Sequence, residues 1–432
     1  MNKKLKGKKV LVYGLGGSGQ AACKLLHMFG ACVSVYDEDK KFRNLFCYVD
    51  EPLFHKYDLV VVSPGVKVLG NSLISGLRAK KTNIISEIDL GSIFSLGTLI
   101  AVTGTNGKTT TCALLGKIFD EAGKKNFVCG NIGLPISSIA LKTDKKSFVI
   151  CETSNFQLEL SRLFAPKIAC VLNIQPDHLD RHETFDEYKR VKAKLFQNFS
   201  SLKHAVINLD DEGAKEIAPQ KKCSFYSFNP LKKGVCVKNG CIYSGKVRII
   251  SLDEIPLIGA KNISNVMAAI SIALLCKIKV KYIRNAIMSF SPPAHRLEYV
   301  DEINGVIYID DSKSTNVACV KMAVESLNSK NLILMLGGQN KGLDFTQFFS
   351  LAPVLKKVIC FGEAGQEIDE IAKQYGYDSQ SFATLRDATY FAKSVAQSGD
   401  TVLLSPGCTS FDEFSSYAVR GQIFSELVRS ES

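Results

Sequence analysis

Residues 99–110 read Leu99-Ile-Ala-Val-Thr103-Gly104-Thr105-Asn106-Gly107-Lys108-Thr109-Thr110. A short apolar run leads directly into a glycine loop, and the loop opens a helical pattern. Such a loop offers backbone N–H groups, a lysine charge and a hydroxyl, which are the groups that bind the β- and γ-phosphates of ATP together with Mg²⁺. Its spacing is not that of a standard Walker motif, because Gly104 precedes Gly107 by only three positions. A purely structural turn needs no lysine followed by three threonines, so the segment predicts a site for a nucleoside triphosphate.

Short apolar runs alternate with longer amphipathic stretches over the rest of the chain, a pattern typical of α/β proteins with mainly parallel sheets. The pattern restarts near residues 92–98, and Ser291-Pro292-Pro293 stops a helix and stiffens the connection. We therefore expect three α/β domains: a Rossmann-like domain over residues 1–93, a central mononucleotide-binding domain over 94–292, and a second Rossmann-like domain over 293–432. In the central domain, Asn239-Gly240 and Ser244-Gly245 predict hairpins.

Composition excludes several classes of protein. The chain of 432 residues is 46% hydrophobic and 22% charged, unlike a disordered or disulfide-stapled protein. No apolar run approaches the roughly 20 residues that a membrane helix needs, and the basic start leads into a strand-like run rather than a signal peptide. The net charge of +12 comes with lysine pairs scattered along the chain, which favours solvated surfaces over a nucleic-acid groove. The 14 cysteines include no CxxC pair and are expected to be reduced core thiols. We therefore expect a cytoplasmic protein without nucleic-acid or membrane partners.

A second glycine loop, Gly14-Leu-Gly16-Gly17-Ser18-Gly19, follows the first apolar run, and Asp37 ends the next one. This is the GxGxxG fingerprint with an acid at the spacing of a ribose ligand. Its glycines let the backbone approach a pyrophosphate at a helix N-terminus. By itself the motif is compatible with NAD, with another nucleotide diphosphate, or with a tight turn that binds nothing.

Polar residues also follow other apolar runs. Glu152 and His178 come after two runs of the central segment, at the kind of strand end where α/β folds bind ligands, and Glu152 is a candidate Mg²⁺ ligand. Glu159 has helical spacing and is expected at the surface. In the last segment, the strand ends at residues 310–316, 337–342 and 405–411 together indicate a site for a small anion. Cys408 has no evident His or Asp partner nearby, so a structural role is expected for it.

These residues resemble the Mur ligase family of peptidoglycan-precursor synthetases over essentially the whole chain. The loop at 103–110 is similar to the family's own phosphate loop, which accounts for its spacing. The segments at 14–19, 152–159, 311–316 and 404–412 look most like the branch of the family that adds D-glutamate. The resemblance implies an ATP-dependent amide ligase that joins D-glutamate to UDP-N-acetylmuramoyl-L-alanine, acting as a monomer in cytoplasmic peptidoglycan precursor synthesis.

The resemblance also implies roles for matching positions. Lys108, His178 and Lys192 would be catalytic, and Lys192 would be carbamylated by CO₂, with Lys194 as the alternative. Two Mg²⁺ ions would be held by Thr109, Glu152, His178 and Lys192. ATP would contact Gly104, Thr105, Asn106, Gly107, Lys108, Thr109, Thr110, Asn262, Asn265, Arg296 and Asp311. The family usually has histidine directly before the asparagine at position 262, where this chain has Lys261.

The two other substrates would bind at the remaining strand ends. The resemblance places the UDP substrate at Gly14, Gly16, Gly17, Ser18, Asp37 and Asn131. It places the incoming amino acid at Lys313, Thr315, Lys341, Ser410, Phe411 and Tyr417. The substrate carboxylate would attack the γ-phosphate to give an acyl phosphate, and the amine would then displace phosphate. Because an acyl phosphate hydrolyses readily in water, we expect the last domain to hinge near residues 291–293 and close over ATP.

Three alternatives agree less well with the sequence. A nicotinamide-dependent oxidoreductase would use the first glycine loop but leave the phosphate loop unexplained. Among other ATP-dependent amide ligases, the segment at 152–159 argues against an alanine-adding Mur enzyme, and the first glycine loop argues against a folate polyglutamate synthetase. A nucleotide-binding regulator would leave Glu152, His178 and Lys192 without a purpose.

Overall fold

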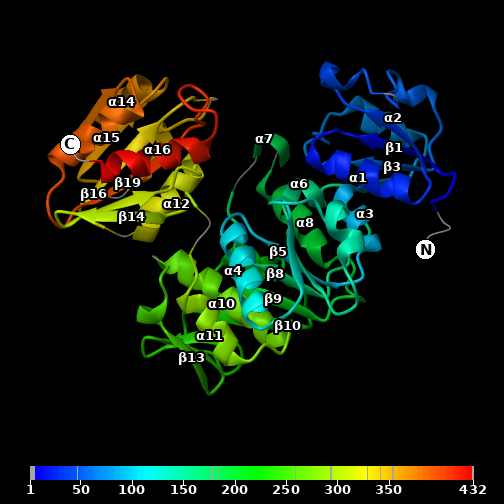
Figure 1. Cartoon of the computed structure of the whole chain (residues 1–432), viewed down its shortest axis with the longest axis horizontal. Helices are drawn as coiled ribbons and strands as arrows, with labels where there is room; N and C mark the ends of the chain where they lie inside the picture. Colours follow the sequence, from blue (N-terminus) through cyan, green and yellow to red (C-terminus); the bar gives the residue numbers. More distant parts are fainter. Residues whose placement is uncertain are drawn as a thin grey trace. The chain divides into compact units, whose positions relative to one another are not determined.

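The computed structural model forms three β-sheets with helices between the strands (Figure 1). It describes residues 5–45, 47–176, 179–182, 184–257, 259–291, 294–327, 329–340, 342–352 and 355–430. The chain divides into two compact units. The first comprises Met1–Pro256 with Asn262–Phe290, and the second comprises Leu257–Lys261 with Ser291–Ser432. Each unit is described by itself below.

The first sheet of unit 1 is parallel, with strand order β2-β1-β3-β4. Its strands are β1 (Lys9–Tyr13), β2 (Cys32–Tyr36), β3 (Leu59–Val62) and β4 (Ile84–Ser86), and its helices are α1 (Gly17–Met28), η2 (Lys40–Phe42), η3 (Pro52–Phe54), α2 (Ser72–Ala79) and α3 (Glu87–Phe94). Successive β1 side chains enter two separate apolar clusters, with Val10 and Val12 in one and Leu11 and Tyr13 in the other. This is why the strand reads as a continuous apolar run.

The second sheet of unit 1 has nine strands in the order β13-β12-β11-β10-β9-β8-β5-β7-β6. The strands are β5 (Thr98–Thr103), β6 (Asn126–Gly130), β7 (Phe148–Glu152), β8 (Ile168–Val171), β9 (His204–Asn208), β10 (Cys223–Ser227), β11 (Val235–Lys238), β12 (Cys241–Ser244) and β13 (Val247–Ser251). The pairs β11–β12 and β12–β13, both at one edge of the sheet, are antiparallel, and the other pairs are parallel. The structure confirms both predicted hairpins; Asn239 and Gly240 have φ of 49° and 68°, as a two-residue primed turn requires.

Helices of this part of unit 1 lie between and beside those strands. They are α4 (Lys108–Glu121), α5 (Ile136–Ile139), η4 (Ala140–Lys142), α6 (Asn155–Leu158), α7 (Leu179–His182), α8 (Phe185–Ala193), η5 (Lys194–Phe196), α9 (Glu212–Glu216), η6 (Leu252–Glu254), α10 (Ala260–Leu275, of which Ala260 and Lys261 fall in unit 2) and α11 (Val280–Met288). Helix α3 joins the two sheets' layers, because the buried Asp89 carboxylate accepts hydrogen bonds from Ser161 Oγ and Phe164 N, both at 2.8 Å. The two sheets therefore belong to one compact unit.

Unit 2 contains a six-stranded sheet in the order β14-β15-β19-β16-β17-β18. Its strands are β14 (Glu298–Ile303), β15 (Val306–Asp310), β16 (Leu332–Gly337), β17 (Lys357–Phe361), β18 (Ser379–Phe382) and β19 (Thr401–Gly407), and its helices are α12 (Val317–Leu327), α13 (Thr346–Leu351), α14 (Gly365–Gln374), α15 (Leu385–Val395) and α16 (Tyr417–Arg429). Among the pairs of neighbouring strands in this order, β14–β15 is antiparallel and the others are parallel. Apolar clusters cover both faces of the sheet, so the predicted α/β class is confirmed here also.

Candidate active site

The phosphate loop joins β5 to α4, as predicted. Its last glycine, Gly107, has φ of 80°, a left-handed conformation that disfavours other residues. A Cβ atom at this position would lie 2.2 Å from Asn265 Oδ1, so glycine also leaves room for α10. Asn265 in turn lies 3.4 Å from Asn262, measured from Nδ2 to Oδ1. The structure thus places Asn265, a predicted ATP contact, at the phosphate loop, with Asn262 beside it.

Two lysines converge on the loop carbonyls. Lys108 Nζ donates to Gly104 O at 2.8 Å and to Thr105 O at 2.7 Å. Lys192 is 1% exposed, and its Nζ donates to the same Gly104 oxygen at 3.0 Å. Lys194 Nζ instead donates to the carbonyl of Glu159, and burial lowers its pKa. The structure therefore places Lys192, rather than Lys194, at the phosphate loop.

Glu152 is a buried carboxylate held between two elements. It ends β7, where it is in register with Val102 of β5 and with Gly130 of β6. Thr109 Oγ1 donates to its Oε2 at 2.9 Å, and Asn131 Nδ2 donates to its Oε1 at 2.8 Å. Asn131, which the resemblance assigns to the UDP substrate, thus lies against the candidate metal ligand. Parallel pairing explains the cluster, because it brings successive strand ends to one edge of the sheet.

Helix α7 adds two residues that the sequence did not single out. Arg181 forms a two-pronged ion pair with Glu159, and Asn155 Nδ2 lies 2.6 Å from His182 Nε2. The expectation that Glu159 is a surface residue is wrong, since its side chain is 8% exposed. The physical reason is that α6 is only four residues long, so helical spacing does not carry from Glu152 to Glu159. The predicted ligand His178 lies outside the described residues.

The first glycine loop forms a tight turn that contacts neighbouring residues. Gly14 has φ of 89°, and a Cβ on Gly19 would lie 1.8 Å from Gly14 O. Gly16 precedes α1, which begins with Gly17 and Ser18. Asp37 Oδ2 accepts a hydrogen bond from Leu15 N at 2.6 Å, so the predicted ribose ligand shapes the loop itself. The tight strand-to-helix turn expected from the motif is present.

Unit 2 gathers most of its predicted residues at strand ends. Asp311 follows β15, and its carboxylate accepts hydrogen bonds from Ser314 Oγ at 2.5 Å and from Ser405 Oγ at 2.8 Å. Burial raises the pKa of Asp311 to about 7. Lys313 Nζ lies 3.7 Å from the ring centroid of Tyr417, at the start of α16. The other predicted residues of unit 2 are Arg296, Thr315, Ser410 and Phe411, all described, and Lys341, which lies outside the described residues.

The buried arginine Arg420 is not marked by any of the motifs in the sequence. It lies on α16 and is completely buried, and its guanidinium donates to Ser312 O, Cys408 O and Thr409 O at 2.9, 3.1 and 3.2 Å. One side chain thereby holds two of the three predicted strand-end loops together. Burial lowers its pKa to about 10 and raises that of Cys408 to about 12. The high thiol pKa agrees with the structural role expected for Cys408.

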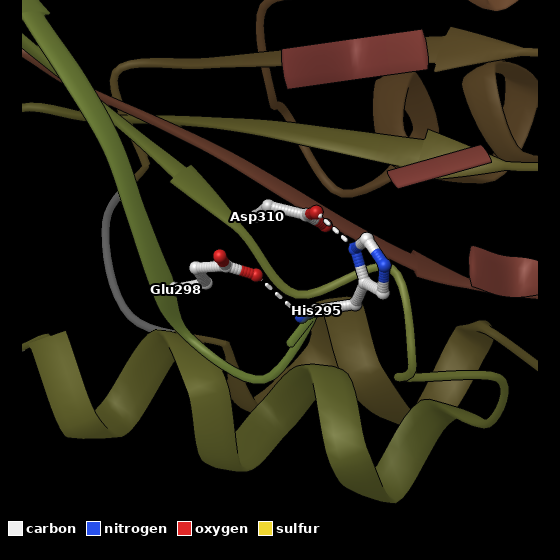
Figure 2. A group of neighbouring side chains, drawn as sticks. All are labelled: His295, Glu298 and Asp310. Atoms are coloured by element: carbon white, nitrogen blue, oxygen red, sulfur yellow. Dashed lines mark hydrogen bonds and ion pairs between the residues drawn. The ribbon is translucent and has the colours of Figure 1, made fainter. Parts of the chain in front are cut away.

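A second missed group consists of His295, Glu298 and Asp310 (Figure 2). His295 Nδ1 lies 2.6 Å from Asp310 Oδ2, and the backbone N–H of His295 donates to Glu298 Oε2 at 2.7 Å. Their ligand atoms lie within 4.8 Å of one another, which is compatible with a metal ion. His295 has a left-handed φ of 64°. Each of the two paired residues directly precedes a predicted ATP ligand: His295 precedes Arg296, and Asp310 precedes Asp311. The hydrogen bonds therefore hold the backbone that carries two predicted ATP ligands. No local pattern marks this pairing in the sequence, because it depends on the β14–β15 register.

Among the described residues, none of the helices is both long and apolar enough to cross a membrane. Lys261, which stands where the family usually has histidine, forms an ion pair with Glu325 at 2.9 Å. Both residues belong to unit 2.

Comparison with known proteins gives the family. Residues 102–273 match the Mur ligase middle domain, and residues 295–408 match the Mur ligase glutamate ligase domain. The chain is 38% identical to the UDP-N-acetylmuramoylalanine–D-glutamate ligase of Thermoanaerobacter sp. (strain X514), over 98% of each chain, and 39% identical to that of Alkaliphilus metalliredigens, over 99% of each. The fold is similar to the UDP-N-acetylmuramate–alanine ligase of Thermotoga maritima, with a TM-score of 0.60 and 17% identity over 98% of this chain and 100% of that one. The chain therefore belongs to the Mur ligase family, among the UDP-N-acetylmuramoylalanine–D-glutamate ligases.

Proposed function

We propose that this chain forms the amide bond between UDP-N-acetylmuramoyl-L-alanine and D-glutamate, through an acyl phosphate, with release of ADP and phosphate. The observation that carries the proposal is the similarity to relatives named for this reaction, at 38% to 39% identity over 98% or more of both chains. The phosphate loop and the carboxylate beside it supply the groups that an ATP-dependent ligase needs.

The residues around the phosphate loop fit ATP and Mg²⁺. Glu152 is a buried carboxylate next to the Thr109 hydroxyl, and Mg²⁺ prefers such oxygen ligands. Gly107 lets the loop backbone lie close to Asn265, because a Cβ atom there would be 2.2 Å from Asn265 Oδ1. Mg²⁺, when bound, neutralises negative charge on the phosphates of ATP. In the proposal Thr109, Glu152 and His178 hold it, and a carbamate on Lys192 helps to hold a second ion.

Lys108 is proposed as the cation that binds the terminal phosphates. Its ammonium already lies within the loop, so a rotation of the side chain exchanges the carbonyls of Gly104 and Thr105 for phosphate oxygens. Helix α4 begins at Lys108, and the free N–H groups of its first turn attract the same anion. These groups stabilise the charge that develops as the substrate carboxylate attacks the γ-phosphate.

The strand ends of unit 2 are proposed to bind the incoming amino acid and part of ATP. The amine of D-glutamate then attacks the acyl phosphate, and phosphate leaves. The mechanism uses no enzyme nucleophile, in agreement with the buried thiol of Cys408. The residues proposed for the amino acid are Lys313, Thr315, Lys341, Ser410, Phe411 and Tyr417, and those for ATP are Arg296 and Asp311.

The first glycine loop is proposed to bind the uridine diphosphate part of the substrate. A redox reaction is not part of the proposal, and the purified protein should not enhance NADH fluorescence. The proposal includes three domains at 1–93, 94–292 and 293–432 and a monomer that acts in the cytoplasm. In support of these limits, every strand of each sheet falls within one of the three ranges.

The test is phosphate release from ATP in the presence of UDP-N-acetylmuramoyl-L-alanine. We expect rapid release with D-glutamate and only background release with L-glutamate, L-alanine or no amino acid. Equal rates with D- and L-glutamate would contradict the proposed acceptor. Release that does not depend on the UDP substrate would contradict the proposed reaction.

A further inference from the structure

Arg181 and Glu159 form a nearly buried ion pair that the roles above leave unused. Arg181 Nε donates to Glu159 Oε1 and Nη2 donates to Oε2, both at 2.7 Å. The two side chains are 10% and 8% exposed. Arg181 lies on α7, and Glu159 directly follows α6, so the pair joins the polypeptide beyond β8 to the polypeptide beyond β7.

The same guanidinium reaches the first sheet of unit 1. Its Nη2 also donates to Val66 O at 2.7 Å and to Pro64 O at 3.2 Å. These carbonyls belong to the loop after β3, and Ser63 at the start of that loop donates to Gly14 O at 2.7 Å. Arg181 therefore connects to the first glycine loop through only one intervening segment.

The guanidinium of Arg181 also packs on an aromatic ring. Its central carbon lies 4.1 Å from the ring centroid of Phe156 in α6. A planar cation with several fixed N–H groups can stack, pair with a carboxylate and donate to carbonyls at once, whereas a lysine ammonium cannot reproduce this geometry. The environment thus requires arginine rather than a positive charge alone.

We infer that Arg181 is a positioning residue for the UDP substrate. It holds the 63–66 loop, and through Ser63 the first glycine loop, at a constant place relative to the β7 strand end that carries Glu152. This inference rests on the proposed function, because the first sheet must bind the nucleotide whose acyl end is delivered to the phosphate loop. A small displacement of a substrate-holding loop lowers the fraction of bound substrate that is aligned for reaction.

The test compares Arg181→Lys and Arg181→Met with a matched control, Arg190→Lys. Arg190 forms a similar two-pronged pair with Glu187, at 2.7 Å for both contacts, on the neighbouring helix α8. That pair is exposed and has no hydrogen bond to the 63–66 loop among those of the described residues. Steady-state rates give KM for the UDP substrate and for ATP separately, and calorimetry with UDP-N-acetylmuramoyl-L-alanine alone gives its affinity without turnover.

We expect Arg181→Lys to raise KM and Kd for the UDP substrate at least tenfold while KM for ATP changes less than twofold. Arg190→Lys should leave all three values unchanged. The loss of affinity caused by Glu159→Gln should be smaller in the Arg181→Met background than in the wild-type background, because both residues act in one network. If Arg181→Met fails to fold, the Lys variant, checked by circular dichroism, still decides the question.

Two results would overturn the inference. One is an unchanged KM for the UDP substrate in Arg181→Lys. The other is an equal rise of both KM values, which indicates general loosening of the fold. Failure of the proposed function is distinct, because the wild-type protein would then not bind UDP-N-acetylmuramoyl-L-alanine at all.

Discussion

Lys108 and Lys192 donate hydrogen bonds to the same carbonyl oxygen, that of Gly104, from positions 84 residues apart. These hydrogen bonds bring the two side-chain nitrogens together at the loop, beside the start of helix α4, whose free N–H groups attract an anion. The pair therefore marks the point at which the phosphate loop is prepared for negative charge.

Lys108→Ala should lower the rate of phosphate release by about 100-fold or more, because the loop loses the charge that stabilises the transferring phosphate. The measurement is the coupled phosphate assay at saturating substrates. Lys124→Ala, in an exposed position just beyond the same helix, is the control and should behave as wild type. An undiminished rate in Lys108→Ala would rule out the assignment of the phosphate loop.

Removal of CO₂ should lower the activity, and bicarbonate should restore it, if a carbamate forms on Lys192. The buried Nζ beside Gly104 is the group whose conversion to an anion would change the charge of the site. Lys192→Ala should be nearly inactive and insensitive to bicarbonate, whereas Lys194→Ala should keep the bicarbonate response. The reverse pattern in the two variants would transfer the carbamate to Lys194.

Asp89→Ala should destabilise unit 1 by about 3 kcal/mol or more, because several hydrogen-bond donors lose a buried charged acceptor. Besides Ser161 Oγ and Phe164 N, the carboxylate accepts from Arg162 N at 3.0 Å and from Leu163 N at 3.1 Å. Urea unfolding followed by circular dichroism measures the effect. Asp50→Ala, which removes an exposed carboxylate, should change the midpoint little.

The stability of unit 2 should fall as the pH rises above neutrality. The hydrogen bond to the Asp310 carboxylate raises the pKa of His295, and Glu298 acts in the same direction. A raised histidine pKa contributes stability that is complete below the unfolded value of about 6.5 and is lost as the pH passes the folded value. The urea midpoint of the wild type should therefore drop between pH 6 and pH 9, and His295→Gln should show a smaller drop. Equal drops in both proteins would show that the pair does not carry the effect.

Addition of an ATP analogue, UDP-N-acetylmuramoyl-L-alanine and D-glutamate together should reduce the radius of gyration. The expected cause is closure of residues 293–432 over the nucleotide, which excludes water from the acyl phosphate. Small-angle scattering with and without the three ligands measures it. An unchanged scattering curve would argue against closure.

Much of the local structure was predictable from residue types. Glycine loops follow β1 and β5, and Asn239-Gly240 makes a hairpin, because these backbone conformations depend on a few neighbouring residues. Glu159 shows where local reasoning failed. Its spacing from Glu152 is helical, yet only four residues between them form a helix, and the carboxylate turns inward to Arg181.

The α/β class and the two glycine loops could be predicted from the residues alone, since short-range sterics and apolar patterning specify strands, turns and helix starts. The contacts between distant residues became visible only in the folded chain: Lys192 rather than Lys194 lies at Gly104, Asn131 contacts Glu152, and Arg181 contacts the loop after β3. The physical reason is that these contacts depend on strand order and on the packing of separate layers. Such long-range choices arise from the whole core rather than from any segment of the chain.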